Sequence, residues 1–545
     1  MNSKKDTTIP VFEALANSVV DHGLDTMFGL MGDANLFLAN HFASELDGRF
    51  VPVVYEGSAV LAAMTFWHVT GKVGVATVTH GPGLSNCLTA LIEGARRYSP
   101  CVIIAGDTPV IDRNALQGAD QREMVKVTGA GFEQVRTAET ALNDLAAAFH
   151  RAAAEKRPIV LNVPSDFMWQ KIPYEKTIYP SFKTINSAVS GDVFDDALGI
   201  IATAKRPILL VGIGANHAQD ALLRLAARLE APIATTLKAK DLFDGCPNNM
   251  DIFGTLSTPD GYEAIDKADC IVSFGASLTS FTTDKGKLFT GKRVVQISDD
   301  LLTLGRFFVP DAGVVADAAI FADKVIELLD EAEINPSGFI QELQVSSLSK
   351  HPDVAKPAET KGYVDLAYSL QVLDQILPQE RLLVTDGGRF MTEVWCRVSA
   401  NKPEHFISGT DFGSIGLGLP SAIGMAVGNP QLPTCLFAGD GGFMMGGLNE
   451  FNTAVRTGLD LIVVVCNDSA YGAEHIQLKD KGLNPDTTEF AWPSFAAVAK
   501  SLGGDGYIID SLAALEAVSD FINNRTTPIL IDLRLDPQTV PRMRK

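Results

Sequence analysis

The chain has 545 residues, of which 46% are hydrophobic and 20% are charged, as in an ordinary globular protein. At roughly 150 residues per domain, this length predicts three domains. The formal net charge of −20 argues against a nucleic acid or an anionic membrane as a partner, because both are bound through basic patches. A small anionic substrate is not excluded, since it needs only a local positive site.

The sequence also carries no sign of membrane insertion or secretion. No apolar run is long enough to cross a bilayer, and the start, MNSKKDTTIPVFEALANSVVDHG, has no continuous apolar segment of the secretory type. The seven cysteines are scattered, without a CxxC pair, and most lie in apolar strand-like runs. This pattern favours buried free thiols in a reducing compartment, so we expect a cytoplasmic protein.

Residues 1–175 alternate helix-like and strand-like segments. The hydrophobic spacing predicts helices at 11–22, 58–68 and 84–95 and strands at 27–30, 50–55, 73–78 and 101–105. Such alternation predicts a parallel sheet covered on both faces, and ligands bind these sheets at the carboxyl ends of the strands. Glu56, His80 and Gln117 each follow a predicted strand, so they are candidate site residues.

A middle region follows a stretch with prolines and tyrosines, 163–186, which is typical of a linker. The predicted elements are a helix at 217–229 and strands at 206–211, 232–237, 270–274 and 293–297. Gly212 and Gly214 form a glycine turn, but the third glycine of a dinucleotide-binding fingerprint is missing. We interpret this region as structural, with nucleotide binding left open.

The third region begins after a second polar linker, 331–362, and again reads as α/β. Its predicted strands are 381–385, 461–466 and 528–533. Two glycine-rich stretches stand out: Asp-Gly-Gly-Arg at 386–389, and 409–430, a loop that runs into a helix of small residues.

The segment 439–472 contains the most specific pattern. It opens with Gly-Asp-Gly, and Asn-Asp follows after residues 442–466. The glycines let the backbone approach phosphate oxygens, and Asp440, Asp468 and the carbonyl of Ala470 offer oxygen ligands. All-oxygen ligands suit Mg²⁺ or Ca²⁺ rather than zinc. The triplet alone is more often a simple turn, but the whole pattern favours a metal-bound diphosphate.

This spacing resembles the metal motif of thiamine-diphosphate (ThDP) enzymes, in which the second part is usually Asn-Asn. Three further segments extend the resemblance over nearly the whole chain: Tyr-Glu-Gly-Ser-Ala at 55–59, Thr-His-Gly-Pro-Gly at 79–83, and the loop 409–420. The chain resembles the ThDP-dependent decarboxylase and acetolactate-synthase superfamily, which includes benzoylformate decarboxylase.

The resemblance implies a fold and an assembly. Three doubly wound parallel-sheet domains are expected: a pyrimidine-binding domain at 1–175, a central domain at 190–335, and a domain for the diphosphate and Mg²⁺ at 360–545. It also implies at least a homodimer, with a homotetramer expected. Glu56 of one subunit would then serve the metal site of another.

The resemblance also implies roles for individual residues. Glu56 would hydrogen-bond the aminopyrimidine ring of the cofactor. Gln117 would line the substrate side. The role of His80 follows from its own chemistry and not from the resemblance: a histidine can exchange a proton with the substrate at pH 7 or orient its carboxylate. The carbonyl of Gly413 would accept from the 4′-amino group, and Ile415 would hold the two cofactor rings in a V shape. Further cofactor contacts are expected at Gly388, Arg389, Phe390, Gly441, Gly442, Tyr471 and Gly472, and substrate contacts at Glu474, His475 and Gln477.

Three positions depart from the family pattern. Asp468 occupies the place of an asparagine and adds negative charge beside a diphosphate, and His80 occupies the place of a serine or alanine. Acetolactate synthases hold a flavin with an Arg-containing segment, whereas the corresponding residues 275–283 include no arginine. We therefore expect ThDP and Mg²⁺ but not FAD.

The leading functional hypothesis is an enzyme that cleaves or forms a C–C bond beside a carbonyl, with ThDP as the electron sink. We favour an acetolactate-synthase-like carboligase acting on a 2-oxo acid or an acyloin, because the Gly-Pro-Gly turn and Gln117 match that branch. The alternatives are a non-oxidative 2-oxo acid decarboxylase of the benzoylformate or pyruvate type and a C–C lyase or hydrolase. A hypothesis of another class is a ThDP-binding protein without turnover.

Overall fold

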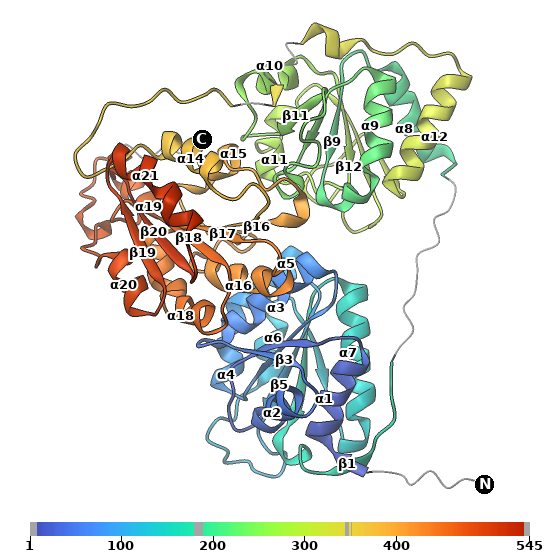
Figure 1. Cartoon of the computed structure of the whole chain (residues 1–545). Helices are drawn as coiled ribbons and strands as arrows, with labels where there is room; N and C mark the ends of the chain where they lie inside the picture. The colour runs from blue at the N-terminus through green and yellow to red at the C-terminus, as the bar shows by residue number, and fades with distance from the viewer. Residues whose placement is uncertain (1–7, 179–188, 344–347, 350, 539–545) are drawn as a thin grey trace.

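The computed structural model describes residues 8–178, 189–343, 348–349 and 351–538. They form three six-stranded sheets in which every pair of neighbouring strands is parallel. Helices pack on the sheets, so that three α/β domains follow one another along the chain (Figure 1). The predicted fold class, three doubly wound parallel-sheet domains, is confirmed.

The N-terminal sheet has the strand order β3-β2-β4-β5-β7-β6. Its strands are β2 (Thr26–Gly29), β3 (Arg49–Pro52), β4 (Gly74–Val78), β5 (Cys101–Asp107), β6 (Gly131–Gln134) and β7 (Pro158–Pro164). Its helices are α1 (Val11–Asp21), α2 (Leu36–Ser44), α3 (Glu56–Thr70), α4 (Pro82–Ser85), α5 (Leu88–Arg97), α6 (Gln121–Lys126) and α7 (Ala141–Glu155). All residues of β4 are buried, as expected of a strand with helices on both faces.

Two elements predicted for this domain differ in the structure. The predicted strand 50–55 stops at Pro52, because the N–H groups of Val54 and Tyr55 donate to the Glu450 carboxylate (3.2 and 3.1 Å) and not to a neighbouring strand. The predicted helix 84–95 is broken into α4 and α5. Asn86 lies at the break and donates from its side chain to Glu56 (2.9 Å).

The predicted linker 163–186 is wrong for its first part. Strand β7 continues to Pro164, and β8 (Lys171–Pro173) pairs antiparallel with β1 (Thr8–Pro10). This pairing joins the first and last strands described in the N-terminal domain. The prolines of the segment had indicated a linker instead of a strand. Residues 179–186 lie outside the described residues.

The middle sheet has the strand order β11-β10-β9-β12-β13-β14. Its strands are β9 (Pro207–Val211), β10 (Ile233–Thr235), β11 (Asn249–Ile252), β12 (Cys270–Phe274), β13 (Arg293–Ser298) and β14 (Ala312–Val315). Its helices are α8 (Asp192–Thr203), α9 (Gln219–Leu229), α10 (Pro259–Lys267), α11 (Ser280–Thr283) and α12 (Ala318–Glu331). In the predicted linker 331–362, residues 344–347 and 350 lie outside the described residues.

The glycine turn of the middle domain has a packing explanation. Gly212 follows β9 and Gly275 follows β12, at the point where the strand order reverses and where such sheets often bind ligands. A Cβ atom on Gly212 would lie 2.3 Å from the Gly275 carbonyl oxygen, so the two loops pack directly on each other. The glycines are required by this close approach.

The C-terminal sheet has the strand order β16-β15-β17-β18-β20-β19. Its strands are β15 (Leu382–Thr385), β16 (Phe406–Ser408), β17 (Thr434–Gly439), β18 (Leu461–Asn467), β19 (Asp505–Ile509) and β20 (Ile529–Arg534). Its helices are α14 (Leu366–Ile376), α15 (Met391–Arg397), α16 (Gly418–Gly428), α17 (Asp440–Gly442), α18 (Leu448–Arg456), α19 (Gly472–Asp480), α20 (Phe495–Ser501) and α21 (Leu512–Asn523).

The N- and C-terminal domains share one hydrophobic core. Helices α3 and α16 lie side by side at their junction (Figure 1), and buried residues of both belong to the same cluster. Gly424 lets the helices approach closely, because a Cβ atom there would lie 2.1 Å from the Ala62 carbonyl oxygen. Thr65 donates to the Ser421 carbonyl across the same contact (2.8 Å).

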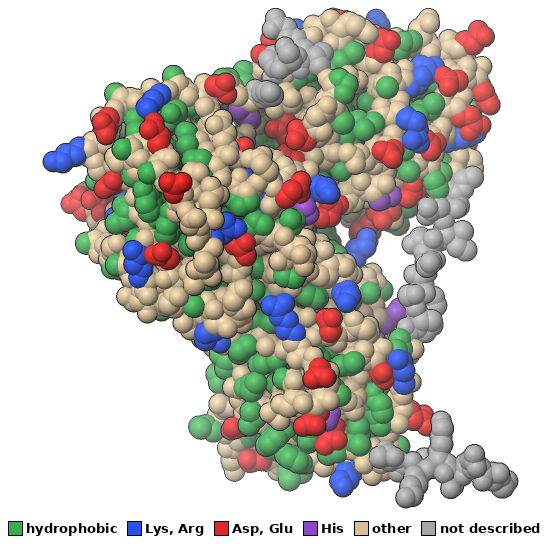
Figure 2. Space-filling view, viewed as in Figure 1, with side chains coloured by type: hydrophobic (Ala, Val, Ile, Leu, Met, Phe, Trp, Pro, Cys, Tyr) green, Lys and Arg blue, Asp and Glu red, His purple; other side chains and the backbone are tan. Residues whose placement is uncertain are grey.

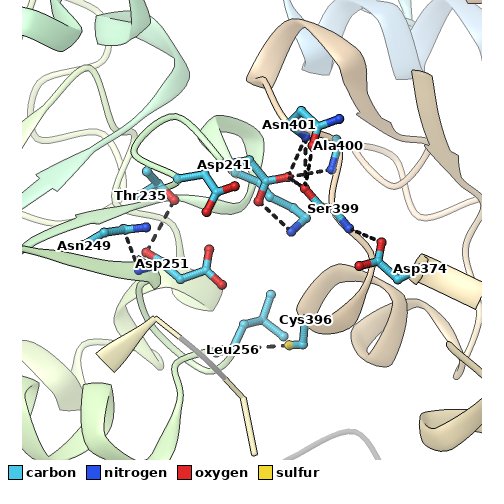
Figure 3. Close-up of polar contacts among 12 residues, drawn as sticks. Thr235, Asp241, Asn249, Asp251, Leu256, Asp374, Cys396, Ser399, Ala400 and Asn401 are labelled. Atoms are coloured by element: carbon cyan, nitrogen blue, oxygen red, sulfur yellow. Dashed lines mark hydrogen bonds and ion pairs between the residues drawn. The ribbon is translucent and has the colours of Figure 1, made fainter. Parts of the chain in front are cut away.

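The middle and C-terminal domains are joined by a polar contact, shown in Figure 3. One carboxylate oxygen of Asp241 accepts from the N–H groups of Ala400 and Asn401 and from the Ser399 hydroxyl (2.6, 3.2 and 3.2 Å), and Lys240 donates to the other oxygen (2.9 Å). Burial raises the pKa of neighbouring Asp251 to about 6.

A search for membrane-crossing helices is negative for the part of the chain that the structure describes. None of its helices has both the length and the apolar composition that crossing a bilayer requires.

Candidate functional site

The two candidate metal-binding carboxylates lie at the ends of adjacent strands. Strand β17 ends at Gly439, which pairs with Cys466 of β18, so Asp440 and Asp468 follow at the same sheet edge. Both side chains are buried. Asp440 accepts from its neighbour Gly441 N–H (2.8 Å) and from the Trp492 indole N–H (3.0 Å), and Asp468 accepts from the Ala470 N–H (3.2 Å).

The electrostatics of this pair fit a cation. Burial and then the nearby Asp468 charge raise the pKa of Asp440 to about 7, and burial raises that of Asp468 to about 6. A divalent cation would relieve both the desolvation and the mutual repulsion. Since the described residues hold no group of three or more His, Cys, Asp or Glu side chains fit for a metal, the remaining ligands would be backbone or cofactor oxygens.

Ala470 suits such a backbone ligand. It forms an isolated antiparallel bridge with Glu489, and the hydrogen bonds of the bridge are made by its neighbours, the Ser469 carbonyl and the Tyr471 N–H. Ser469 adopts a φ of +55°, a left-handed conformation that turns the chain sharply after Asp468. The Asn467 side chain accepts from the Ser469 N–H (3.1 Å) and stabilises this turn.

Three glycine-rich segments meet beside the pair, and Asp386 holds them. Its fully buried carboxylate follows β15 and accepts from the N–H groups of Gly387 (2.8 Å) and Gly416 (2.9 Å). A Cβ atom on Gly446 would lie 2.1 Å from the Gly416 carbonyl, and one on Gly442 would lie 2.9 Å from Asp386 Oδ2. Only glycine allows this nesting of backbone, which leaves a cradle lined by main-chain groups.

The cradle includes an irregular helix. Between α17 and α18 the chain forms one π-helical turn, Phe443–Gly447, which widens the helix directly after the Gly-Asp-Gly triplet. Such turns are frequent at functional sites. No pattern in the sequence of this segment indicates the extra residue of the turn.

The expected cofactor contacts from three loops surround the same place. Arg389 is buried and donates to the Gly472 carbonyl (2.7 Å), and its charge acts to lower the pKa of Asp468 against the effect of burial. Phe390 is buried too, and a Cβ atom on Gly388 would lie 2.6 Å from its ring. Ile415 is partly buried against Gly387.

Two further residues of the cradle lie at its edge. Gly413 is exposed and has a φ of +83°, a conformation that favours glycine. Tyr471 packs on Gly441, where a Cβ atom would lie 2.5 Å from the Tyr471 ring.

Trp492 is a residue that the sequence reasoning missed. Its ring stacks on Phe490 (4.6 Å between centroids), which in turn contacts Tyr471. The hydrogen bond of Trp492 places this stack beside Asp440, one member of the metal-ligand pair. No motif marks Trp492, because the contact joins segments 52 positions apart.

Glu56 begins α3, and its segment is tied to the C-terminal domain of the same chain. Asn86 donates to Glu56 Oε2, and the Tyr55 hydroxyl donates to the Asn86 carbonyl (both 2.9 Å). Glu450, fully buried on α18, accepts from the two N–H groups that precede Glu56, and burial raises its pKa. Glu450 is a second residue that no sequence signal indicated.

The structure brings His80 and Gln117 together. His80 Nδ1 lies 2.9 Å from the Thr79 hydroxyl. The next residue, Gly81, has a φ of +57°, and a Cβ atom on it would lie 2.3 Å from the Gln117 carbonyl oxygen. Gln117 therefore packs against the residue that directly follows His80.

The three residues expected over the substrate divide between two environments. Glu474 and Gln477 are exposed on α19. His475 is buried, with Nδ1 at 3.2 Å from the Thr488 hydroxyl and 3.7 Å from Glu489 Oε1. The structure thus turns His475 toward the protein interior, and substrate contact by any of the three stays a prediction.

The two halves of the expected site are not joined directly within one chain. Among the hydrogen bonds of the described residues, none links the side chains of Glu56, His80 or Gln117 to the C-terminal domain. The prediction that the halves meet across two subunits stays a prediction.

Three family models match the chain in order. They are described as thiamine pyrophosphate enzyme, N-terminal TPP binding domain (residues 9–128), central domain (194–325) and C-terminal TPP binding domain (386–533). The chain belongs to the thiamine-diphosphate-dependent enzyme superfamily. The family resemblance is confirmed, and ThDP is the cofactor that its domains are built to bind.

Curated relatives extend over nearly the full length. The sulfoacetaldehyde acetyltransferase of Castellaniella defragrans is 26% identical, across 95% of this chain and 92% of the relative. The acetolactate synthase large subunits of Haemophilus influenzae and Parasynechococcus marenigrum are 24% and 28% identical, across 96% and 98% of this chain and 94% and 89% of the relatives. This chain is therefore similar to enzymes of the superfamily throughout all three domains.

Proposed function

We propose that this protein is a ThDP- and Mg²⁺-dependent carboligase of the acetolactate-synthase type. It would release CO₂ from a 2-oxo acid and join the remaining acyl unit to a second carbonyl compound. The observation that carries the cofactor assignment is the buried pair Asp440 and Asp468 beside the glycine cradle. The carboligase assignment rests on the full-length similarity to acetolactate synthases and to an acetyltransferase.

The C-terminal residues would bind and orient the cofactor. Asp440, Asp468 and the Ala470 carbonyl would hold Mg²⁺, and Gly388, Gly441, Gly442, Tyr471 and Gly472 would let the main chain approach the diphosphate. Arg389 and Phe390 would support this turn, Gly413 would offer its carbonyl to the 4′-amino group, and Ile415 would contact the rings. When bound, ThDP supplies an electron sink for the bond next to the substrate carbonyl.

The N-terminal residues would handle protons. Glu56 would hold and move a proton at the aminopyrimidine nitrogen, and the Asn86 side chain donates to its Oε2. His80 is engaged by Thr79 through Nδ1, so we assign proton exchange with the substrate to Nε2. Gln117 would donate its amide to the substrate carboxylate. Glu474 and Gln477, exposed on α19, would face the second carbonyl compound.

The same histidine favours a second candidate function, a non-oxidative 2-oxo acid decarboxylase. A proton donor beside the substrate promotes protonation of the acyl carbon, which gives an aldehyde instead of a ligation product. The two outcomes differ only in whether a proton or a second carbonyl compound reaches that carbon first.

A product screen decides between them. The protein is supplied with ThDP, Mg²⁺ and each of a series of 2-oxo acids, acyloins and cyclic diketones, with and without an acceptor aldehyde, and CO₂ and product masses are measured. Ligation products support the carboligase, aldehyde alone refutes it in favour of the decarboxylase, and cleavage of acyloins or diketones indicates a lyase or hydrolase. Absence of turnover throughout would favour a non-catalytic ThDP-binding protein.

Glu56→Gln tests the proton role. The variant keeps the size of the side chain and removes its ability to hold a proton, so turnover is expected to fall by at least 100-fold. Glu45→Gln, an exposed change at the end of α2, is the matched control. Unchanged turnover in Glu56→Gln would refute the assignment.

We further propose that the working unit is at least a homodimer and that a homotetramer forms. Figure 2 shows apolar side chains gathered on the face of the N-terminal domain, and exposed apolar residues flank both half-sites, including Val54 and Tyr55 before Glu56 and Met445 in the cradle. Exposed apolar surface beside a half-site is what a subunit interface would cover. Light scattering on the purified protein measures the assembly.

A further inference from the structure

A buried glutamine lies behind the turn that carries His80. Gln121 begins α6 and is only 2% exposed, although glutamine is a polar residue that usually lies at the surface. Its Oε1 accepts from the Gly81 N–H (2.7 Å), and its Nε2 donates to the Gly106 carbonyl at the end of β5 (2.9 Å) and to Asn162 Oδ1 on β7. Every polar atom of the side chain therefore has a partner.

The orientation of this amide is fixed from the far end of a network. Asn162 is buried and donates from Nδ2 to Asp107 Oδ2 (2.6 Å) and to Gln134 Oε1 (3.0 Å). Because the Asp107 carboxylate can only accept, Asn162 must present Oδ1 to Gln121, and Gln121 must then present Oε1 to Gly81. Asp107 on β5 thus favours the orientation in which Gln121 Oε1 faces the Gly81 N–H.

The turn itself has little freedom of its own. Gly81 has a φ of +57°, and its backbone touches the Gln117 carbonyl, four residues before Gln121. The peptide between His80 and Gly81 is therefore held between the Gln117 backbone on one side and the Gln121 amide on the other. Moving Gln121 would move His80 relative to Gln117.

We propose that Gln121 is a positioning residue for the substrate side of the site, which sets the separation of His80 and Gln117 through its hydrogen bond to the Gly81 N–H. The inference rests on the proposed function, in which those two side chains meet the substrate. An error of about 1 Å in such a placement can lower a rate by about 100-fold. A buried network in which every member is satisfied is also the arrangement that holds one geometry.

The matched control is another buried glutamine. In the middle domain, Gln296 accepts from the Gly305 N–H and donates to the Ala276 carbonyl (both 3.0 Å), so it joins two loops with the same chemistry far from the candidate site. Gln121→Met and Gln296→Met remove the same groups and keep similar volume. Both should bind ThDP within twofold of the wild type, as followed by titration calorimetry.

Kinetics separate positioning from a loss of folded protein. Gln121→Met is expected to lower kcat/KM for the 2-oxo acid at least tenfold and to raise KM, whereas a partly unfolded preparation would lower kcat and kcat/KM in the same proportion and leave KM unchanged. In a double-mutant cycle, His80→Ala with Gln121→Met should be no worse than His80→Ala by itself, because Gln121 acts through His80. Additive losses would overturn the inference.

Gln121→Glu supplies a conservative rescue with a pH signature. When protonated, the new carboxyl can accept from Gly81 and donate to Gly106, as the amide does. When ionised, it can no longer donate, so its oxygen faces two other acceptors, the Gly106 carbonyl and Asn162 Oδ1. The negative charge of Asp107 lies at the other end of the same network. Its activity relative to wild type should therefore fall as pH rises from 6 to 8, and a constant ratio would contradict the assignment.

A measurement without substrate keeps the inference independent of the reaction. Hydrogen–deuterium exchange of a peptide that contains residues 79–83 should accelerate at least tenfold in Gln121→Met and remain unchanged in Gln296→Met, since the Gly81 N–H loses its acceptor. Unchanged exchange would overturn the inference even if turnover falls. Accelerated exchange in a wild-type background that turns over no 2-oxo acid would refute the proposed function and leave the positioning of the turn supported.

Discussion

Replacing Asp468 by asparagine tests whether the buried, ionised Asp468 carboxylate destabilises the fold when no cation is bound. Burial raises the pKa of Asp468 to about 6, against about 3.9 for an ordinary aspartate. A difference of about two pK units corresponds to roughly 3 kcal/mol that the metal-free fold loses when this carboxyl ionises. Because the pKa is raised in the folded state, the loss is absent below pH 4, grows as pH rises toward 6 and is complete above it.

The assay is thermal unfolding in a chelator at several pH values. At pH 8 the metal-free Asp468→Asn variant should be more stable than wild type by about 3 kcal/mol, or about 6 °C or more for an unfolding unit of 150–250 residues. The advantage should shrink as pH falls toward 4. The variant also lowers the pKa of Asp440, because the Asp468 charge contributes to its rise.

Saturating Mg²⁺ and ThDP should reduce or reverse the stability advantage of the variant over the wild type, since the ligands stabilise the wild type by binding only its folded state. Asp520→Asn, an exposed change on α21, is the matched control and should leave both curves unchanged. A metal-free Asp468→Asn variant that melts at or below the wild-type temperature at pH 8 would show that ionising the buried Asp468 carboxyl does not destabilise the metal-free fold.

Four further predictions follow from the same geometry. Glu56→Gln and Asp440→Asn, each inactive alone, should together recover about a quarter of wild-type turnover after random assembly, and no recovery would place the site within one chain. Trp492→Phe removes the bond to Asp440 and should raise the Mg²⁺ concentration for half-maximal activity about tenfold. Gly446→Ala should lower stability by about 1–3 kcal/mol in thermal melts, because its methyl group meets the Gly416 carbonyl, whereas Gly199→Ala in open space should not. The raised pKa of Asp251 should lower the melting temperature of the wild type as pH rises from 4 to 6, and Asp251→Asn should abolish this contribution.

Most of the fold could be predicted from the sequence because its strands are buried on both faces. Runs such as Leu461–Asn467 and Cys270–Phe274 are buried throughout, and all of their residues except Asn467 and Ser273 are apolar. The predicted elements are wrong where a side chain far away in the sequence binds backbone N–H groups that the element would have used. Glu450 takes the N–H groups of Val54 and Tyr55 and ends a strand that local propensity would extend.

The site was predictable where the cofactor demands a residue type at a fixed spacing. Asp440, Asp468 and the surrounding glycines belong to one continuous motif, and the structure places them together. Hydrogen bonds that no local pattern encodes join Trp492 to Asp440, Glu450 to the backbone before Glu56, and Gln121 to the turn after His80. His475 shows the converse, since its neighbours on α19 face solvent and it does not.

The contact between α3 and α16 supports a site shared between subunits. Glu56 begins α3, and that helix interlocks with α16 of the same chain at the Gly424–Ala62 approach and the Thr65–Ser421 hydrogen bond. Since the two domains share a core, close packing fixes the position of Glu56 relative to the C-terminal domain of its own chain. Our proposal that Glu56 of one subunit serves the metal site of another therefore makes a direct prediction, which is that the mixed Glu56→Gln and Asp440→Asn assembly regains activity.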